Sequence, residues 1–288
     1  MTANILQVEG LKVAFPGRGF RAKPIEVLHG VDLHIGAGEV VGLVGESGSG
    51  KTTIGRAVLG LVKASGGSIR FHSEDITDAS PARRRQLAKQ IQVIFQDPYS
   101  SLNPALSVGD ILSEPLIVQG ATPRDARKRV VELLDRVGLP GDAAQRLPRE
   151  FSGGQRQRVA IARALAPEPE LIVCDEAVSA LDLSTQAIVL DLLQDIQRTT
   201  GVALLFISHD LAVVRHVSNR VAVIYKGNIV ETGSAAEVTS RPQHPYTRRL
   251  LFASPVADPV QQRERRAARK QLAQMGLLDT RSGVTVSV

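Results

Sequence analysis

One short glycine-rich segment constrains this chain more than any other feature. Residues Gly45 to Thr52 read GESGSGKT and fit the pattern GxxxxGK[ST] at every position. An apolar run, Val40–Val44, precedes the segment, and a helical pattern, Thr53–Leu61, follows it. Glycines let consecutive backbone N–H groups point into one concavity, and the start of a helix adds partial positive charge. The segment therefore predicts a phosphate-binding loop between a strand and a helix.

Two side chains at the end of this loop suit a nucleoside triphosphate. Lys51 offers a compact cation for the β- and γ-phosphates, and Thr52 offers a hydroxyl to Mg²⁺. ATP and Mg²⁺ are therefore the expected ligands. The residues expected to hold the nucleotide here are Gly45, Glu46, Ser47, Gly48, Ser49, Gly50, Lys51, Thr52 and Thr53.

An acidic pair follows a second apolar run. Leu171–Cys174 leads directly into Asp175 and Glu176. Asp175 at a strand end can hold Mg²⁺, directly or through water, and Glu176 is placed to polarise a water for attack on the γ-phosphate. A lone Asp-Glu pair can also be a solvated strand end, and the phosphate loop upstream favours the metal and base roles. Cys174 is expected to be a small buried hydrophobic residue and not a nucleophile.

Short apolar runs alternate with helical patterns, which favours an α/β fold with a parallel sheet. Their near-continuous Val, Ile and Leu content is typical of strands covered on both faces. The expected strands are Val40–Val44, Ile91–Phe95, Leu171–Asp175, Ala203–Ser208 and Val221–Tyr225. Ile5–Phe15 and Val31–Ile35 are predicted as additional edge strands, and Asn228–Thr232 could pair with Val221–Tyr225.

The chain changes character between about residues 97 and 149, where Pro and charged helical patterns become frequent. Thr122 is a good N-cap, Pro123 suits the first turn, and Gly138 can end the helix. We predict a helical insertion here. A third, helical and basic region is expected from Ser234 onward.

Composition bears on the compartment and the partners. The longest apolar runs are far shorter than the roughly 20 residues needed to cross a bilayer, and no signal-peptide pattern is visible at the N-terminus. Of the 288 residues only one is cysteine, so the cytosol is the expected compartment. The net charge is +6, with basic clusters at 83–85 and 263–270. Such clusters are either solvated faces or surfaces near a membrane or partner.

Another segment narrows the class of phosphate-loop protein. Phe151–Arg158 reads FSGGQRQR and resembles the LSGGQ signature of ATP-binding-cassette (ABC) ATPases. The resemblance implies a P-loop ABC ATPase core, with a RecA-like parallel sheet and an antiparallel β subdomain. It also implies that the signature closes over ATP held by a second ABC ATPase subunit, identical or, as we favour, a related heterodimer partner. The nucleotide-contacting residues that it implies are Ser152, Gly153, Gly154 and Gln155.

Further family landmarks occur in the expected order. Gln96 matches the Q-loop glutamine, which contacts Mg²⁺ or the attacking water, and Ser179–Asp182 matches the D-loop. His209 matches the switch histidine near the γ-phosphate. Phe15 resembles the aromatic residue that stacks on adenine, with Phe20 as a rival. The resemblance thus implies Glu176, His209 and Gln96 as catalytic residues and Thr52, Gln96 and Asp175 as metal contacts.

Two segments resemble one subgroup, the oligopeptide and dipeptide importers. They are Gln96–Pro104, which reads QDPYSSLNP, and His244–Thr247, which reads HPYT. The resemblance implies a peripheral subunit at the cytoplasmic face of the inner membrane, where ATP hydrolysis drives uptake of peptides or a related small solute. Its partners would be two permeases and, through them, an extracytoplasmic solute-binding protein, with no nucleic acid. An exporter cassette and a soluble, non-transport ABC ATPase are the alternatives.

The same resemblance divides the chain into three parts. Residues 1–96 and 150–233 would form the ATPase core, and 97–149 the inserted helical subdomain. Residues 234–288 would form the C-terminal extension typical of the oligopeptide-transporter subgroup, together with the basic tail.

Overall fold

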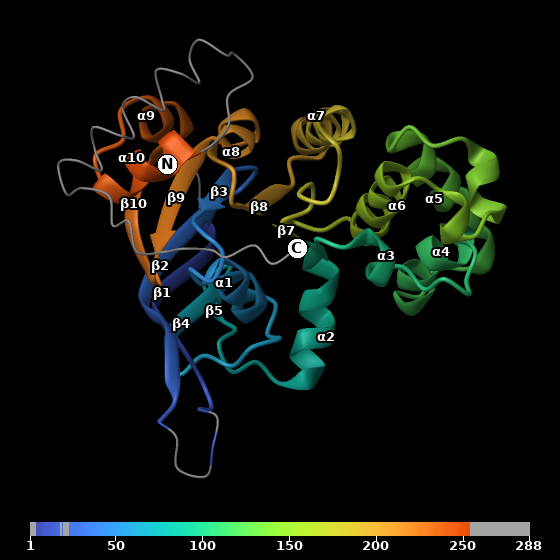
Figure 1. Cartoon of the computed structure of the whole chain (residues 1–288). Coiled ribbons are helices and arrows are strands. Elements are labelled where there is room, and N and C mark those ends of the chain that lie inside the picture. Colours follow the sequence, from blue (N-terminus) through green and yellow to red (C-terminus); the bar gives the residue numbers. More distant parts are fainter. Residues whose placement is uncertain (1–3, 18, 20–22, 254–288) are drawn as a thin grey trace.

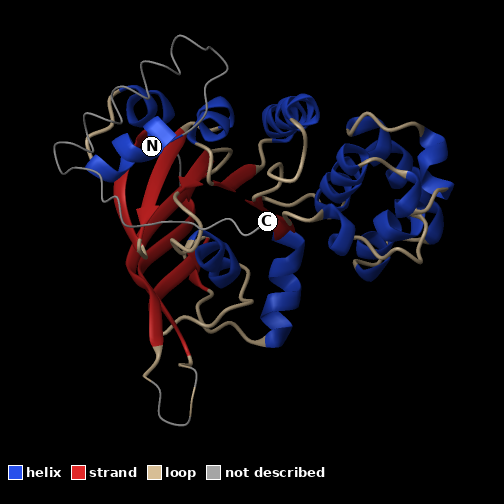
Figure 2. Cartoon of the chain, in the orientation of Figure 1, coloured by secondary structure: helices blue, strands red, loops and turns tan. Residues whose placement is uncertain are grey.

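The computed structural model describes residues 4–17, 19 and 23–253 of the chain. Strands and helices form one half of the molecule, and a group made only of helices projects from it (Figures 1 and 2). Phe20 and the basic cluster at 263–270 lie outside the described residues.

A six-stranded sheet forms the centre of the strand-containing half. Five neighbouring strands are parallel, and one antiparallel strand lies at an edge. The order across the sheet is β10 (Asn228–Ser234), β9 (Arg220–Tyr225), β3 (Val40–Val44), β8 (Ala203–Ser208), β7 (Leu171–Asp175) and β6 (Ile91–Ile94). This confirms the predicted parallel sheet and the pairing of β10 with β9.

Both faces of this sheet are buried, which explains the continuous apolar runs. Along β8, Leu204 and Phe206 belong to one core, whereas Leu205 and Ile207 belong to the other. Helices α7 (Leu183–Thr200) and α8 (Leu211–Val217) cover the first face, and α1 (Lys51–Val58) and α2 (Pro81–Gln90) add to the second core. Cys174 is fully buried, and this burial raises the pKa of its thiol to about 12, as expected for a packing residue.

A second, antiparallel sheet packs into the core that contains α1 and α2. Its order is β2 (Ile25–Gly36), β1 (Asn4–Phe15), β4 (Gly66–Phe71) and β5 (Glu74–Asp75). The prediction of edge strands was therefore wrong for β1, which lies between β2 and β4. The antiparallel β subdomain implied by the family resemblance is confirmed.

The projecting group follows β6 in the chain (Figure 1). It contains α3 (Pro98–Ser101), α4 (Val108–Val118), α5 (Pro123–Arg136) and α6 (Gly153–Leu165), with short 3₁₀ turns at Gly141–Gln145 and Pro148–Glu150. Thr122 caps α5 as predicted, since its side chain accepts a hydrogen bond from the Asp125 amide. Gly138 follows the helix with a φ of +65°, also as predicted.

Two short helices complete the described chain, α9 (Ala235–Ser240) and α10 (Pro245–Ala253). They confirm the helical character predicted after Ser234. Over the described residues, no helix is both long and apolar enough to cross a membrane.

Candidate nucleotide site

The topology of the parallel sheet brings the predicted residues to one edge. In the parallel register, Val44 is paired with Ser208, and Asp175 with Ile207. The carboxyl ends of β3, β8 and β7 therefore lie side by side. The phosphate loop, residues 45–52, leaves β3 there, Glu176 follows β7, and His209 follows β8. Thr52 and Asp175, which are 123 residues apart in the chain, thus meet because parallel strands end at the same edge.

The backbone of the phosphate loop depends on its glycines. A Cβ atom at Gly45 would lie 2.3 Å from the Ile224 carbonyl oxygen, and one at Gly50 would lie 2.6 Å from Leu28 Cδ2. Gly50 also has a φ of +107° and precedes α1 without giving it a side-chain cap. The amides at the start of α1 are therefore not occupied by a capping side chain, which suits an anionic ligand.

Lys51 lies folded within this loop. Its side chain is only 4% exposed, and Nζ donates to the carbonyl oxygens of Gly45 at 2.9 Å and Glu46 at 3.0 Å. Burial lowers the pKa of the Lys51 ammonium. Beside it, the hydroxyl of Ser49 is buried and has no hydrogen-bond partner among the described residues. A buried cation and an unpaired donor in a ring of amides fit phosphate oxygens.

The loop is joined to β7 by one hydrogen bond. Thr52 Oγ1 donates to Asp175 Oδ1 at 2.9 Å, so two of the three predicted metal contacts touch. Burial raises the pKa of Asp175, and the neighbouring charge of Glu176 adds to this rise, while the bond from Thr52 opposes it. A carboxylate that is poorly solvated gains from a nearby cation.

Glu176 lies between two basic side chains. Its Oε1 is 3.9 Å from Lys51 Nζ, and its Oε2 is 3.7 Å from His209 Nδ1. Its backbone has a φ of +50°, in the left-handed region that non-glycine residues seldom adopt, and its amide donates to the Ile207 carbonyl oxygen at 3.0 Å. Such strain is frequent at functional sites, where the surrounding structure holds it.

The D-loop contacts this carboxylate residue from the other side. Ser179 Oγ donates to the Glu176 carbonyl oxygen at 2.9 Å. Asp182 caps α7, and hydrogen bonds led by the one from the Ser184 hydroxyl lower the pKa of Asp182. The D-loop thus connects the turn after β7 to the start of α7.

Two predicted residues stand apart from this cluster. Gln96 follows β6, is exposed, and makes no hydrogen bond to any described residue. Phe15 ends β1 and is 40% exposed. The structure thus leaves both side chains accessible without bringing either into contact with Lys51 or Glu176.

The signature segment, Ser152–Gln155, begins α6 and lies apart from α1 (Figure 1). Its two polar side chains satisfy one another's backbone: Ser152 Oγ accepts from the Gln155 amide at 3.3 Å, and Gln155 Oε1 accepts from the Ser152 amide at 2.9 Å. The two glycines differ. A Cβ atom at Gly154 would lie 2.2 Å from Thr185 Cγ2, whereas one at Gly153 would have no contact closer than 3.8 Å.

Helix α10 makes a contact that sequence reasoning missed. The amide of Glu46, inside the phosphate loop, donates to the hydroxyl of Tyr246 at 2.8 Å. Arg249 Nη2 lies 3.4 Å from Glu46 Oε1. Tyr246 was singled out only as part of the subgroup motif, and no local pattern links residues 200 positions apart.

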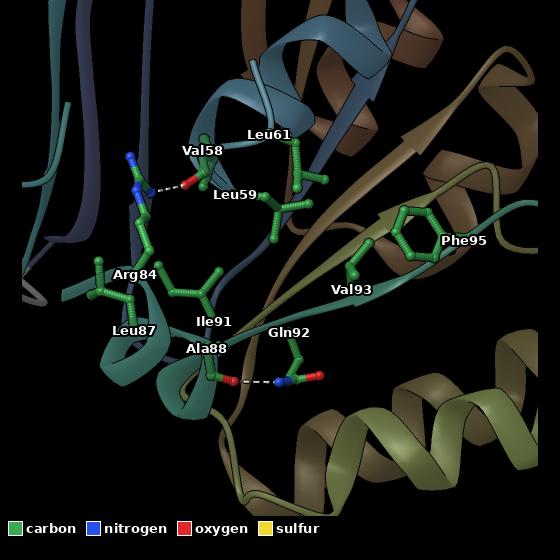
Figure 3. A pocket seen from close by; sticks show the side chains of 10 residues that line it. All are labelled: Val58, Leu59, Leu61, Arg84, Leu87, Ala88, Ile91, Gln92, Val93 and Phe95. Carbon is green, nitrogen blue, oxygen red and sulfur yellow. Dashed lines mark hydrogen bonds between the residues drawn. The ribbon is translucent and has the colours of Figure 1, made fainter. Parts of the chain in front are cut away.

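An apolar groove of about 220 Å³ lies near Gln96, between the end of α1, α2 and β6 (Figure 3). Leu59, Leu61, Val93 and Phe95 line it, and Leu61 is 62% exposed. The Arg84 guanidinium closes one end by donating to the Val58 carbonyl oxygen at 3.1 Å.

Comparison with known proteins agrees with this geometry. Residues 28–179 match the ABC transporter family, and residues 230–279 match the oligopeptide/dipeptide transporter C-terminal region. Among curated proteins, the glutathione import ATP-binding protein GsiA is 52% identical over 267 residues in both Shigella flexneri serotype 5b and Escherichia coli K12. The match covers 91% of this chain but 43% of each relative, so the chain spans less than half the length of these proteins.

Solved structures show the same fold. The cbiO1 protein of Clostridium perfringens, part of the ABC transporter complex cbiONQ, has a TM-score of 0.74 and 27% identity, and the match covers 95% of this chain and 97% of that one. A dimeric post-hydrolysis state of the ATP-binding cassette MJ0796, bound to ADP and Pi, has a TM-score of 0.71 and 27% identity, and covers 80% and 98%. The family that the signature segment resembled is therefore confirmed: the chain belongs to the ABC transporter family.

Proposed function

We propose that this chain binds and hydrolyses MgATP as the energy-supplying subunit of an importer. One observation carries this proposal: Lys51, Thr52, Asp175 and Glu176 form a continuous cluster at the edge of the sheet where the phosphate loop begins. The cluster combines a cation for phosphate, oxygen ligands for a metal and a carboxylate that can act on water. That combination is typical of phosphoryl transfer to water.

The phosphates of ATP would occupy the loop. Lys51 would exchange its bonds to the Gly45 and Glu46 carbonyl oxygens for the β- and γ-phosphates, and the unpaired Ser49 hydroxyl could join it. The loop residues proposed to hold the nucleotide are Gly45, Glu46, Ser47, Gly48, Ser49, Gly50, Lys51, Thr52 and Thr53. Phe15, exposed at the end of β1, would stack on the adenine ring.

The residues present also fit Mg²⁺. Thr52 Oγ1 and Asp175 Oδ1 are hard oxygen donors 2.9 Å apart, and within residues 4–17, 19 and 23–253 no group of three or more His, Cys, Asp or Glu could hold a metal by itself. Such a small number of protein ligands is typical of Mg²⁺, which keeps several waters and binds phosphate oxygens as well. When bound, Mg²⁺ would neutralise charge on the phosphates. Gln96 would approach it or the attacking water.

Glu176 is the proposed general base. Its carboxylate would accept a proton from the attacking water, and Lys51 would attract the γ-phosphate toward that water. His209, 3.7 Å from Glu176, would orient the carboxylate and contact the γ-phosphate. The backbone of Glu176 is bonded to Ile207 and Ser179, and this would hold the carboxylate in position.

A second ATP-binding subunit would complete the site. Ser152, Gly153, Gly154 and Gln155 of each chain would close over the nucleotide held by the other, because the signature segment lies apart from its own phosphate loop (Figure 1). The dimeric form of the MJ0796 cassette supports this arrangement. ATP would join the pair, and loss of the γ-phosphate would release it. We favour a related, non-identical partner.

The importer assignment rests on similarity. The relatives are named for glutathione import, and residues 230–279 match the oligopeptide/dipeptide region, so the proposed cargo is a short peptide, glutathione or a related small solute. Two permeases and an extracytoplasmic binding protein would select it. The chain would lie at the cytoplasmic face of the membrane, with the apolar groove near Gln96 receiving a permease segment.

We also propose the domain division expected from the sequence. Residues 1–96 and 150–233 would act as the core, 97–149 as the helical subdomain and 234–288 as the extension. Movement of the helical subdomain would transmit nucleotide closure to the permeases.

The test is affinity purification of the full chain from membranes, followed by ATPase measurement. Recovery of permeases and a solute-binding protein, with ATP hydrolysis stimulated by that binding protein and its solute, is the expected result. Recovery of ribosomes would indicate a soluble, non-transport ATPase. Permeases without any binding protein would indicate an exporter. Absence of ATP hydrolysis in the purified complex would refute the proposal.

A further inference from the structure

Helix α10, in the described part of the C-terminal extension, contacts the phosphate loop itself. Tyr246, in the first turn of α10, accepts a hydrogen bond from the Glu46 amide at 2.8 Å, and Glu46 is the second residue of the loop. The Tyr246 side chain is only 4% exposed. A backbone amide in a functional loop is thus held by a residue from a separate region of the chain.

The surroundings of Tyr246 hold its hydroxyl in place. Its ring packs against Tyr225 at the end of β9, with centroids 4.2 Å apart and the planes tilted by 32°. Before α10, the Glu231 carboxylate accepts hydrogen bonds from the Gln243 amide at 2.8 Å and the His244 amide at 3.0 Å. The start of α10 is therefore fixed to β10, so Tyr246 can act as a rigid support.

A second contact reaches the same loop residue. Arg249, one turn further along α10, places Nη2 3.4 Å from Glu46 Oε1. Its guanidinium lies 5.1 Å from the centroid of the Tyr246 ring and 5.7 Å from that of Tyr225. Both ends of Glu46, its amide and its carboxylate, are therefore engaged by α10.

The other side of the loop is supported by the β9–β10 turn. The Gly227 amide donates to the Ser49 carbonyl oxygen at 2.9 Å. Two hydrogen bonds from outside therefore hold the loop between Glu46 and Ser49. The Gly227 amide of the β9–β10 turn donates one, and the Tyr246 hydroxyl of the extension accepts the other. Loops of this kind bind phosphate well only when their amides are already oriented.

We propose that Tyr246 and Arg249 are positioning residues for the phosphate loop, through which the C-terminal extension sets nucleotide affinity. This inference rests on the proposed nucleotide binding. Tyr246 should contribute more than Arg249, because its buried side chain makes a 2.8 Å hydrogen bond, whereas the Arg249–Glu46 pair is 3.4 Å long, partly exposed and screened by water. Anything that displaces α10 would then weaken phosphate binding without touching the nucleotide.

The experiment compares Tyr246→Phe with Tyr225→Phe in the full chain. Each change removes one hydroxyl from the same aromatic pair, but the Tyr225 hydroxyl has no hydrogen bond among the described residues. Affinity is measured by titration with a fluorescent ATP analogue and by competition with tripolyphosphate, which lacks the base. Hydrogen exchange of residues 45–49 is measured without ligand, and thermal unfolding is recorded.

The expected result is a loss of affinity of about three- to ten-fold for both probes with Tyr246→Phe, the effect typical of one lost hydrogen bond. Exchange at 45–49 should be faster, while Tyr225→Phe should resemble the wild type. A loss for the ATP analogue alone would indicate a base contact and overturn the proposal. So would unchanged affinity together with unchanged exchange.

The experiment also covers two other outcomes: an unfolded Tyr246→Phe variant and a wild type that does not bind nucleotide. If Tyr246→Phe is unfolded, Arg249→Gln replaces it and should weaken both probes in the same direction by a smaller factor; no change would overturn the proposal. If the wild type binds neither probe, the proposed function fails, while the exchange measurement still decides whether Tyr246 orders the loop.

Discussion

The phosphate loop and the signature segment each lie at the start of a helix, where backbone amides lack partners within the helix. They differ in whether a side chain caps those amides. Gly50 leaves α1 without a side-chain cap, and Lys51 is folded back onto loop carbonyl oxygens. In contrast, α6 carries a reciprocal cap in which Ser152 and Gln155 each bond the other's backbone. One helix start is incomplete without a ligand, and the other is satisfied within its own chain.

The difference indicates how the two regions can share one task. A helix start with free amides and a buried cation gains most from an anion. A capped helix start is stable without nucleotide, so the signature segment keeps its shape in a single chain, as the proposed pairing of two chains requires. The phosphate loop therefore should determine binding, and the signature segment should determine turnover in the pair.

The largest effect should come from Glu176→Gln. The change keeps the shape and removes the carboxylate that lies between Lys51 and His209. Turnover in the assembled complex should fall by about 10²–10⁴-fold, the range typical of losing a general base. ATP affinity measured by titration should be retained, and wild-type turnover in this variant would exclude the proposed role of Glu176.

A matched pair of glycine changes probes the signature segment. Gly154→Ala would place a methyl group 2.2 Å from Thr185 Cγ2, so the free energy of unfolding should fall by about 1–3 kcal/mol. Gly153→Ala has room, so stability should be retained. Its turnover should fall only in the assembled complex, while nucleotide affinity of the isolated chain stays unchanged. Loss of affinity in the isolated chain would contradict the division of roles.

Asp175→Asn should stabilise the ligand-free chain while impairing turnover. Because burial raises the pKa of Asp175, the folded chain holds that proton more tightly than the unfolded chain does. The free energy of unfolding therefore falls as the pH rises from the ordinary aspartate pKa through the raised one. Removing the charge should raise Tm at neutral pH by a few degrees, roughly 2–4 °C for each 1 kcal/mol.

Calorimetry at several pH values checks whether Asp175→Asn raises or lowers the Tm. The advantage of the Asn variant should be present at pH 7 and should shrink under acidic conditions, where Asp175 is protonated. A variant that is less stable than the wild type at pH 7 would show that the carboxylate is well stabilised in the folded chain. Added Mg²⁺ and ATP should raise the Tm of the wild type more than that of the variant.

The smallest effect concerns the contact between Phe15 and the adenine ring. Phe15→Ala should weaken ATP binding by about 2–12-fold, the range expected for one aromatic stack, without affecting tripolyphosphate. Because Phe15 is 40% exposed, stability should change little. Phe20→Ala is the matched control. If only the Phe20 variant loses affinity, the stacking role belongs to Phe20.

The central strands were predictable because their sequences carry little ambiguity. β3, β7 and β8 are buried on both faces, so nearly every residue in them is apolar. The cap at Thr122 and the left-handed Gly138 gave local signals for α5. The family and the phosphate loop could likewise be predicted from contiguous residues.

The elements missed lack such signals. In α2 only Leu87 is buried, so its charged sequence shows no apolar stripe. β4 begins with two glycines and buries only Ile69 and Phe71. Contacts such as Tyr246 with Glu46 depend on the path of the whole chain. Periodicity reports which face of an element is buried, and it does not report which distant residue covers it.

The burial of Cys174 has a practical consequence. The chain contains no other cysteine, and this thiol is fully buried on β7, where burial raises its pKa and suppresses its ionisation. Thiol reagents act on the exposed thiolate. A cysteine introduced at a partly exposed position with room for a side chain, such as Gly153, would therefore be the sole reactive thiol. A fluorophore attached there would report the approach of the second subunit that we propose.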